Sequence, residues 1–441
     1  DKMLQWKNES GGNTALLVEG ARRIGKSTVV EEFAKNEYES YILVDFATAS
    51  KEVRELFDDV SDLNYLFLQL QLQYRKDLHE RRSVIIFDEV QLCPMARQAI
   101  KTLVKDHRYD YIETGSLISI KKNVRDIVIP SEERKVSMYP MDYEEFLWAL
   151  GDETTFSLLR QCFEKNIPLG DAVHRKQLRQ FRLYMLVGGM PQAVSAFVEG
   201  RTYREIDFIK RNILSLYEDD LKKHDNDSNE KASIIFKTIP EQLSNRNSHF
   251  RMAGVEKNAR YQNYIGAIDF VAESMIANLC VNTTSPEVAL ELHADRRNFK
   301  LYMGDTGLLV SQIMKNRDDT EEDLYKSLIF DRLGINQGMI MENLVAQMLR
   351  SRGYELYFHE FEISGGEGRK PNKYEIDFLL VRNKKLCPIE VKSSGYKNHK
   401  SFDMFAGKYQ TKVQERYMIC AKDLSVEENI IRIPLYMTMC L

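Results

Sequence analysis

The sequence predicts an α/β protein that is divided into several domains. A glycine-rich segment at 20–27 lies between a strand-like run and a helix-like run, and an apolar run at 83–87 ends in two carboxylates. Beyond residue 338 the pattern changes, and further strand-like runs carry acidic residues and a lysine. A chain of 441 residues is long enough for about two to four domains.

The composition is that of a globular protein, with 43% hydrophobic and 29% charged residues. The net charge of -4 argues against a uniformly basic surface for nucleic acid but leaves local basic patches open. The six cysteines form no C-x-x-C pair, so neither a zinc ribbon nor a disulfide framework is indicated, and a cytoplasmic location is expected. No uncharged apolar run is long enough to span a bilayer, and the segment after Asp1 lacks a signal-peptide pattern, so no membrane partner is expected.

The first functional pattern is the loop that follows the strand expected at 14–19. Its residues are Gly20, Ala21, Arg22, Arg23, Ile24, Gly25, Lys26 and Ser27, with Thr28 opening the next helix. They match G-x-x-x-x-G-K-[ST], the phosphate-binding P-loop, whose backbone N–H groups and helix N-terminus face one polyphosphate. Lys26 is expected to reach the β- and γ-phosphates, and the Ser27 hydroxyl to hold Mg²⁺. The sequence therefore predicts a site for ATP or ADP with Mg²⁺.

A second pattern follows the buried strand expected at 83–88. Its apolar run ends in Asp88 and Glu89, and the carboxyl end of a parallel strand is where an α/β sheet places ligand-binding groups. Asp88 is expected to orient Mg²⁺ or its water, and Glu89 to polarise the water that attacks the γ-phosphate. A later strand ends in Thr114 and Ser116. Either hydroxyl could bind the attacking water or the γ-phosphate, and an ordinary helix cap is the alternative.

The arginine that would stabilise transition-state charge is not fixed by the sequence. Arg134 precedes the last core strand, expected at 135–140, and Arg125 is the alternative candidate. A solvated surface arginine is the other interpretation of either residue.

The order of these motifs resembles a known family. The P-loop, the run I-I-F-D-E-V-Q, T-G-S and Y-P-M-D-Y-E-E-F are similar to those of a prokaryotic AAA-type ATPase family. The resemblance implies ATP hydrolysis, an ATPase core at 1–145 and a helical lid at 146–228. It also extends to G-G-M-P at 188–191, similar to a lid turn that lies against the nucleotide base in related signal-transducing ATPases. A base contact by Pro191 and a plain turn between helices both remain open.

The pattern of residues in the middle of the chain predicts a winged helix-turn-helix domain at 229–325. Helical patterns over 231–243, 250–255 and 261–271 precede two strand-like runs at 276–281 and 299–303. Basic residues occur where such a domain meets phosphates, namely Arg246, Arg251, Lys257, Arg260, Arg296 and Arg297. Helix-turn-helix domains also bind proteins, so DNA and a protein partner are both possible occupants. The run D-T-G-L-L at 305–309 closes this region and resembles a turn of the same ATPase family.

The region 326–441 predicts a second α/β domain with a charged site. Side chains alternate along a strand, so Glu390 and Lys392 share one face, and Asp377 lies opposite its apolar neighbours. Adjacent strands can then present Asp377, Glu390 and Lys392 together, and Glu342 lies on the preceding helix. Two carboxylates and a lysine suit a Mg²⁺ or Mn²⁺ ion with an activated water.

The order of these residues resembles the PD-(D/E)XK nuclease fold, with Ile376-Asp377 as a departure from its "PD" element. The resemblance implies that Asp377 and Glu390 bind metal and that Glu342 and Lys392 assist cleavage. A charged edge of a packed hairpin and a nuclease fold that only grips DNA are the alternatives. The whole chain is then expected to be an ATP-hydrolysing protein that acts on DNA. The rival is an ATP-gated signalling protein whose C-terminal half binds a protein, and a homo-oligomer is possible in either case.

Overall fold

The computed structural model describes residues 1–116, 131–224, 230–245, 249–314, 337–364, 370–394, 399–427 and 429–441. The chain forms two compact units, which are described separately. The first contains Asp1–Tyr139 with Glu273–Met275, and the second contains Pro140–Ala272 and Ile276–Leu441. Within the described residues, no helix is both long and apolar enough to cross a membrane.

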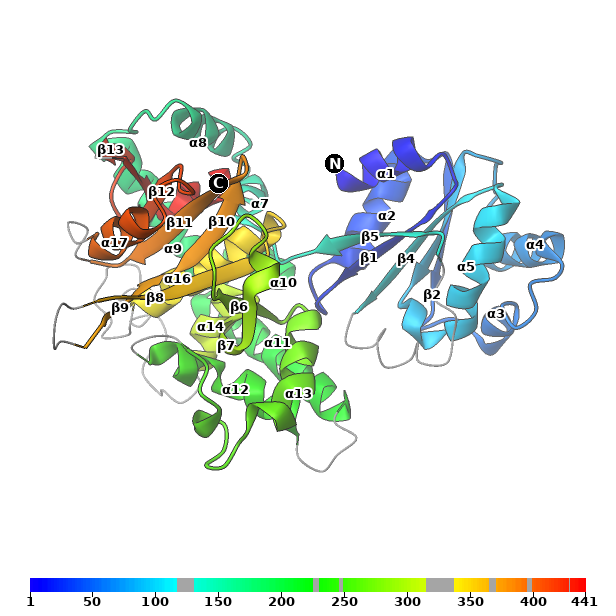
Figure 1. Ribbon diagram of the computed structural model, residues 1–441. Coiled ribbons are helices and arrows are strands. Elements are labelled where there is room, and N and C mark those ends of the chain that lie inside the picture. Colours follow the sequence, from blue (N-terminus) through cyan, green and yellow to red (C-terminus); the bar gives the residue numbers. More distant parts are fainter. Residues whose placement is uncertain are drawn as a thin grey trace. The chain divides into compact units, whose positions relative to one another are not determined.

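The first unit is built on a five-stranded parallel sheet with the order β2-β3-β4-β1-β5 (Figure 1). The strands are β1 (Ala15–Gly20), β2 (Ser40–Asp45), β3 (Ser83–Asp88), β4 (Asp110–Ser116) and β5 (Glu133–Met138). All five lie close to the runs that their apolar patterns predicted. Because β1 lies between β4 and β5, and β3 borders β4, the carboxyl ends of β1, β3 and β4 meet at one edge of the sheet.

Helices cover both faces of this sheet (Figure 1). They are α1 (Lys2–Ser10) and α2 (Lys26–Glu37) on one face, and α3 (Lys51–Glu55), α4 (Leu63–Tyr74) and α5 (Pro94–Asp106) on the other, with the 3₁₀ turn η1 (Val90–Leu92) after β3. Trp6 of α1 and Val30 of α2 pack with one set of strand side chains, whereas Leu66 of α4 and Ile100 of α5 pack with the other. The strands are therefore buried on both faces, which explains their continuous apolar runs.

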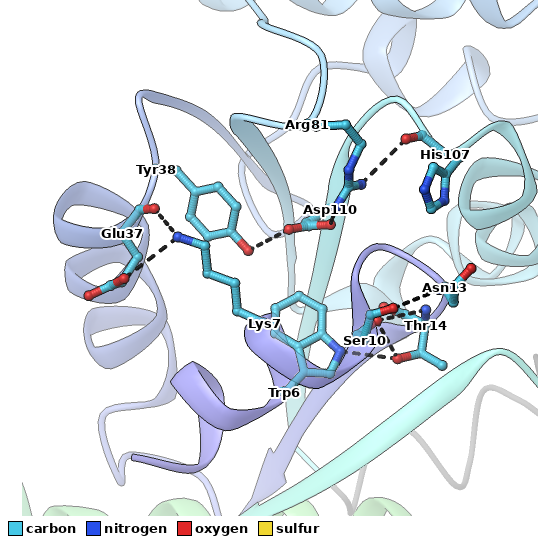
Figure 2. A network of polar contacts seen from close by, with 10 residues as sticks. All are labelled: Trp6, Lys7, Ser10, Asn13, Thr14, Glu37, Tyr38, Arg81, His107 and Asp110. Atoms are coloured by element: carbon cyan, nitrogen blue, oxygen red, sulfur yellow. Dashed lines mark hydrogen bonds and ion pairs between the residues drawn. The ribbon is translucent and has the colours of Figure 1, made fainter.

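Polar contacts anchor α1 to the sheet and to α2 (Figure 2). The Trp6 indole N–H donates to Thr14 Oγ1 at 3.2 Å, just before β1. Lys7 Nζ donates to the main-chain carbonyl oxygen of Glu37 and forms an ion pair with that residue's carboxylate at 3.6 Å. Figure 2 also shows the Tyr38 hydroxyl donating to Asp110 Oδ2 at 2.8 Å, at the start of β4. These contacts fix the elements that carry the P-loop.

A buried charge network links α5 to β4 and β5. Arg97 Nη1 lies 3.3 Å from Glu113 Oε2, Arg97 Nη2 lies 2.9 Å from Glu133 Oε2, and all three side chains are almost fully buried. Burial raises the pKa of Glu113 well above its ordinary value, the Arg97 guanidinium opposes this, and the neighbouring Glu133 adds to it. One guanidinium thus serves two buried carboxyl groups.

The second unit begins with a helical region. Its helices are α7 (Tyr143–Ala149), α8 (Thr155–Glu164), α9 (Asp171–Val187), α10 (Pro191–Val198), α11 (Tyr203–His224), α12 (Lys231–Ser244) and α13 (Tyr261–Glu273), with a 3₁₀ turn η2 (Met252–Gly254). Asp142 caps α7, as its position predicted, in a reciprocal arrangement with Glu145.

Two sheets complete this unit. The first, in the order β7-β6-β8-β9, contains β6 (Ala277–Thr283), β7 (Ala294–Met303), β8 (Leu356–Ile363) and β9 (Asn372–Ile376). The second, in the order β10-β11-β12-β14-β13, contains β10 (Phe378–Arg382), β11 (Lys385–Lys392), β12 (Arg416–Cys420), β13 (Ser425–Glu427) and β14 (Ile430–Pro434). The remaining elements are η3 (Leu290–His293), α14 (Thr306–Ile313), α16 (Gln337–Ser351), α17 (Lys400–Lys408) and η4 (Leu435–Cys440).

The compact units of the structure divide the chain differently from the expected domains. The first unit ends at Tyr139 rather than at 145, and no compact unit ends near 228 or 325. The two strands expected as a free wing, β6 and β7, belong to a larger sheet because β6 also pairs in parallel with β8. Side-chain contacts join the same regions, since Asn343 Oδ1 accepts from the Met303 N–H at 2.7 Å. The expected winged-helix and nuclease-like regions therefore share one sheet.

A second correction concerns the strand expected at 375–380. The structure has two strands there, with Asp377 in a bend between them. β9 pairs with β8 in one sheet, and β10 pairs with β11 in the other. Asp377 therefore lies where the chain passes from one sheet to the next.

Candidate functional sites

The loop between β1 and α2 has the geometry of an anion-binding turn. Gly25 precedes the helix with φ 88°, in the left-handed region that glycine adopts without strain. A Cβ on Gly20 would lie 2.4 Å from the Met138 carbonyl oxygen of β5 and 2.5 Å from Ile24 Cδ1. Both glycines are thus required by the path of the backbone, and α2 begins at Lys26 with its N-terminus at the loop.

Lys26 is enclosed by the loop that precedes it. Its Nζ donates to the carbonyl oxygens of Ala21 at 2.8 Å and Gly20 at 3.2 Å, and the residue is 7% exposed. Burial lowers the pKa of Lys26 to about 8, although the nearby carboxylates of Glu89 and Asp88 oppose the shift. A polyphosphate in the loop would give this ammonium stronger acceptors than neutral carbonyls.

Ser27, Asp88 and Thr114 meet at the carboxyl edge of the sheet. Ser27 Oγ donates to Asp88 Oδ1 at 2.7 Å, and Thr114 Oγ1 donates to the same oxygen. Asp88 is 8% exposed, so its carboxylate is held by two hydroxyl groups with little water. A hydroxyl and a carboxylate oxygen side by side are ligands that suit Mg²⁺, so the residues fit the ion that the P-loop implies.

Glu89 follows in an unusual backbone conformation. Its φ of 51° and ψ of 45° are left-handed for a non-glycine residue and turn the chain out of β3 into η1. The Gln91 side-chain amide donates to Glu89 Oε2. Gln91 is 2% exposed and was not predicted as a site residue, although it stands only two positions beyond Glu89. The left-handed turn and this amide together hold the Glu89 carboxylate in place.

The other predicted residues of the nucleotide site occupy ordinary positions. Ile24 is buried, Arg23 has a left-handed φ of 68°, and Thr28 is exposed on α2. Arg134 forms an exposed ion pair with Glu9 at 2.5 Å, which favours the surface interpretation of that arginine. Arg125 lies outside the described residues.

The turn at 188–191 has a structural partner that the sequence did not indicate. The Gly189 N–H donates to Asp305 Oδ2 at 2.6 Å, and a Cβ on Gly188 would lie 2.4 Å from Asp305 Oδ1. A Cβ on Gly307 would lie 2.5 Å from Gly188 Cα, so the two family-like motifs pack against each other inside the second unit. Pro191 opens α10 at its first position, where proline is favoured. The contact of Pro191 with a nucleotide base stays a prediction.

In the second unit, the predicted charged residues come together. The first β10–β11 pair is Phe378 with Ile389, so Asp377 and Glu390 lie beside each other at the end of this ladder. The Val391 N–H donates to Asp377 Oδ2 at 2.8 Å. Lys392 Nζ lies 2.8 Å from Glu390 Oε2, as the alternation of side chains predicted.

The carboxyl groups of this cluster are buried together. Burial raises the pKa of Asp377 to about 8, with Glu342 and Glu390 adding to the shift and Lys300 opposing it. Burial also raises the pKa of Glu390, which is 1% exposed. The groups that stabilise the Glu390 carboxylate are the Lys392 ammonium, 2.8 Å away, and the nearby Ser401 hydroxyl. Buried carboxyl groups with so few donors fit a divalent cation held by oxygen ligands.

Lys300 of β7 was missed by sequence reasoning. It is 1% exposed, and its Nζ lies 2.6 Å from Glu375 Oε1 and 3.9 Å from Glu342 Oε2. Burial lowers the pKa of Lys300, but Glu342 and Glu375 outweigh this and hold it above the ordinary value. Tyr302, two residues on, donates its hydroxyl to Glu342 Oε2 at 3.2 Å. The only sequence signal was a lysine within an otherwise apolar strand.

Most of the predicted DNA-contacting residues are on the surface. Exposed positions are Arg251, Lys257, Arg260, Arg296 and Arg297. Arg296 forms an ion pair with Asp269 at 3.2 Å. Arg246 lies outside the described residues.

Three protein families match successive parts of the chain. The AAA domain family matches residues 12–147, which cover the sheet and the P-loop. Residues 178–319 and 337–437 match two families that are described as domains of unknown function, DUF8612 and DUF4143. The first match agrees with the parallel sheet and the loop geometry, so residues 12–147 are similar to the AAA domain family in both sequence and architecture.

Comparisons with whole proteins are less informative. A Walker-type ATPase of Pyrococcus abyssi is 14% identical, with 71% of this chain and 95% of that chain covered and a TM-score of 0.40. Cdc6p of Pyrobaculum aerophilum is 12% identical, with 75% and 92% covered and a TM-score of 0.23. A Vibrio cholerae protein is 11% identical, with 96% and 95% covered and a TM-score of 0.18. These values are too low to transfer function, and no curated protein matched the chain.

Proposed function

We propose that the first unit binds ATP with Mg²⁺ and hydrolyses it. The observation that carries this proposal is the convergence of Ser27, Asp88 and Thr114 beside the P-loop lysine. The AAA-type match supports the same activity.

The residues divide the work as follows. Lys26 binds the β- and γ-phosphate oxygens, and the backbone N–H groups of the loop bind the same polyphosphate. Ser27 and Asp88 would hold Mg²⁺, which supplies positive charge to the phosphate oxygens. Glu89 accepts a proton from the attacking water and orients it, while Gln91 keeps the Glu89 carboxylate in place. Thr114 holds Asp88 and so acts as a positioning residue.

Nucleotide binding tests this assignment directly. A fluorescent ATP analogue is titrated into the full-length protein and its Lys26→Ala variant in the presence of Mg²⁺. The variant loses the cation that faces the phosphates, so we expect its affinity to fall by at least about tenfold, equivalent to about 1.4 kcal/mol. Lys35→Ala, on the exposed side of α2, is the matched control and should bind like the wild type. Equal binding by the Lys26 variant would contradict the proposal.

We further propose that the second unit is a metal-dependent DNA nuclease. This proposal rests on the closeness of Glu342, Asp377, Glu390 and Lys392. The elements around them follow in the order α16, β8, β9, β10, β11, α17 and β12, which supports the resemblance to the PD-(D/E)XK fold. Asp377 and Glu390 would hold Mg²⁺ or Mn²⁺, which would acidify a water next to the phosphodiester. Lys392 orients that water or stabilises the developing negative charge.

The test is incubation of supercoiled plasmid with the full-length protein and Mn²⁺. Wild-type protein should nick the plasmid, whereas Asp377→Asn should not, because the amide removes a charged metal ligand with little change in volume. Asp403 is an exposed residue of α17, so Asp403→Asn controls for a general effect of losing one carboxylate. Equal nicking by all three proteins would indicate a contaminant. No nicking by any of them would favour a DNA-gripping or protein-binding role.

A further inference from the structure

A second cluster of possible metal ligands lies on the four-stranded sheet. Its members are His249, which precedes β7 in the chain, Glu360 of β8 and Glu375 of β9, and their ligand atoms all lie within 4.8 Å of one another. Glu360 and Glu375 are direct partners in the antiparallel β8–β9 pair, so both carboxylates project from the same face. His249 Nε2 lies 2.8 Å from Glu375 Oε2 and 3.7 Å from Glu360 Oε1.

Neighbouring side chains orient each member of this His249 cluster. The Asn298 amide donates to Glu360 Oε2 at 2.6 Å, and Lys300 Nζ donates to Glu375 Oε1 at 2.6 Å. Each carboxylate therefore has one oxygen fixed by a donor from β7 and the other facing the imidazole. The His249 ring packs edge-on against Phe358 with ring centroids 5.1 Å apart. Such outer contacts are what hold metal ligands in place in proteins.

We propose that His249, Glu360 and Glu375 bind a first-row divalent transition-metal ion such as Zn²⁺. One imidazole nitrogen and two carboxylate oxygens favour such an ion over Mg²⁺, which prefers oxygen ligands alone. Two ligand atoms of a tetrahedral zinc ion are expected to lie about 3.3 Å apart. The distances from His249 Nε2 to the two carboxylate oxygens, 2.8 Å and 3.7 Å, lie on either side of this value. Glu360 is exposed, so water can complete the coordination. The ion would replace the hydrogen bond between His249 Nε2 and Glu375 Oε2.

This site is distinct from the Asp377 cluster and does not depend on the nuclease proposal. Its carboxylates are on β8 and β9, whereas Asp377 faces Glu390 of β11. Lys300 touches both clusters, through Glu375 on one side and Glu342 on the other. An ion at His249 would thus sit next to the lysine that neutralises the nuclease-like carboxylates.

Cobalt titration tests the proposal, because Co²⁺ replaces Zn²⁺ and absorbs visible light when an imidazole and carboxylates coordinate it. Full-length protein without an affinity tag is stripped with a chelator, dialysed and titrated with Co²⁺ and, by calorimetry, with Zn²⁺. In Asp377→Asn, whose nuclease-like cluster has lost a ligand, we expect one equivalent to bind, and we expect the same equivalent to be present in the wild type. His249→Gln and Glu360→Gln should each weaken that equivalent by at least about tenfold. Glu360 is exposed, so the second variant tests the site even if the first one folds poorly.

His293→Gln is the matched control, since His293 Nε2 also faces a carboxylate, Glu287 Oε2 at 3.7 Å, and among the described residues this pair belongs to no group of three possible metal ligands. It should bind like the wild type. Absence of Co²⁺ and Zn²⁺ binding, or an equivalent in Asp377→Asn that survives the further change His249→Gln or Glu360→Gln, would overturn the proposal and leave the cluster as a hydrogen-bonded group of side chains. Loss of binding only in Asp377→Asn would assign the ion to the nuclease-like cluster instead.

Discussion

Glu113 is a single buried residue that makes the stability of the folded protein depend on pH. Its pKa is raised in the folded protein, so the folded state binds more protons than the unfolded chain between the unfolded pKa near 4.5 and the higher folded pKa. This group therefore lowers the free energy of unfolding as the pH rises through that window. Glu113→Gln removes the titration, and we expect the stability of the variant to decline less from pH 5 to pH 8. Chemical denaturation at a series of pH values measures the difference.

An exposed carboxylate provides the control for Glu113. Glu39 pairs with Arg82 on the surface, where such pairs contribute about 0 to 1 kcal/mol, so Glu39→Gln should leave the pH profile close to that of the wild type. A Glu113→Gln profile that runs parallel to the wild-type profile would show that Glu113 is ionised throughout.

Residues in local motifs could be predicted from the sequence, whereas residues that act through long-range contacts could not. Lys26, Ser27 and Asp88 stand in patterns whose spacing predicts one shared site, and the structure does bring Ser27 and Asp88 into contact beside the loop. Lys300 meets Glu342 and Glu375 only because β7 and β9 share a sheet with β6 and β8 between them. No spacing in the sequence encodes that neighbourhood.

At the level of secondary-structure elements, the turn at 188–191 packs against α14. Gly188 has φ 82° and lies against Asp305 and Gly307, so a methyl group there meets both an unfavourable backbone region and two neighbours. We expect Gly188→Ala to destabilise the second unit by about 1 kcal/mol from the backbone and about 1 to 3 kcal/mol more from overpacking. Urea denaturation followed by circular dichroism measures this loss.

Gly200 is a matched control because its φ of 76° is similar but no atom lies within 4 Å of a Cβ added there. Gly200→Ala should show the backbone cost alone. If the two variants lose the same stability, the contact between the two motifs contributes nothing.

The strands of the first unit were predicted well because a parallel strand buried on both faces is a continuous apolar run. The break at Asp377 was missed, since Glu375 to Leu380 has the alternation of one unbroken strand. Its two halves pair with different partners, β8 and β11, and the choice of partner depends on the tertiary structure.

For the whole molecule, we predict salt-sensitive binding to double-stranded DNA. Replacing Arg251, Lys257 and Arg297 by alanine should weaken binding and reduce the slope of log affinity against log salt by up to about 0.9 for each lost phosphate contact. Fluorescence anisotropy at several salt concentrations measures both quantities.

The control for this triple variant replaces three exposed lysines elsewhere on the surface by alanine, so that the change in net charge is the same. These are Lys51, Lys384 and Lys385. If both triple variants keep the wild-type slope, a protein partner becomes the better candidate for the basic surface. If the slope of log affinity against log salt falls equally in both triple variants, the weaker binding results from the change in net charge rather than from particular contacts.

The two proposed active sites lie in different compact units, so they should fail independently. Asp377→Asn should abolish DNA nicking and leave ATP turnover within about twofold of the wild type, a difference of about 0.4 kcal/mol. Parallel assays of phosphate release and plasmid nicking on one preparation give both values. A joint loss would show that the units are functionally coupled.

For the whole chain, the sequence predicted a succession of regions but not which of them fold together into one unit. The polar segment at 225–230 suggested a domain boundary, yet residues on both sides belong to one unit. The β6–β8 pairing joins strands that are far apart in the chain, and only the folded protein reveals such a pairing.

The central claim, ATP hydrolysis by the P-loop unit, is tested most directly by phosphate release in wild-type protein and Glu89→Gln with saturating ATP and Mg²⁺. Glutamine retains the size of the side chain but cannot accept the proton of the attacking water, so turnover should fall by a factor of about 10² or more while nucleotide affinity is unchanged. Equal turnover in the two proteins, or no phosphate release by the wild type, would contradict the account.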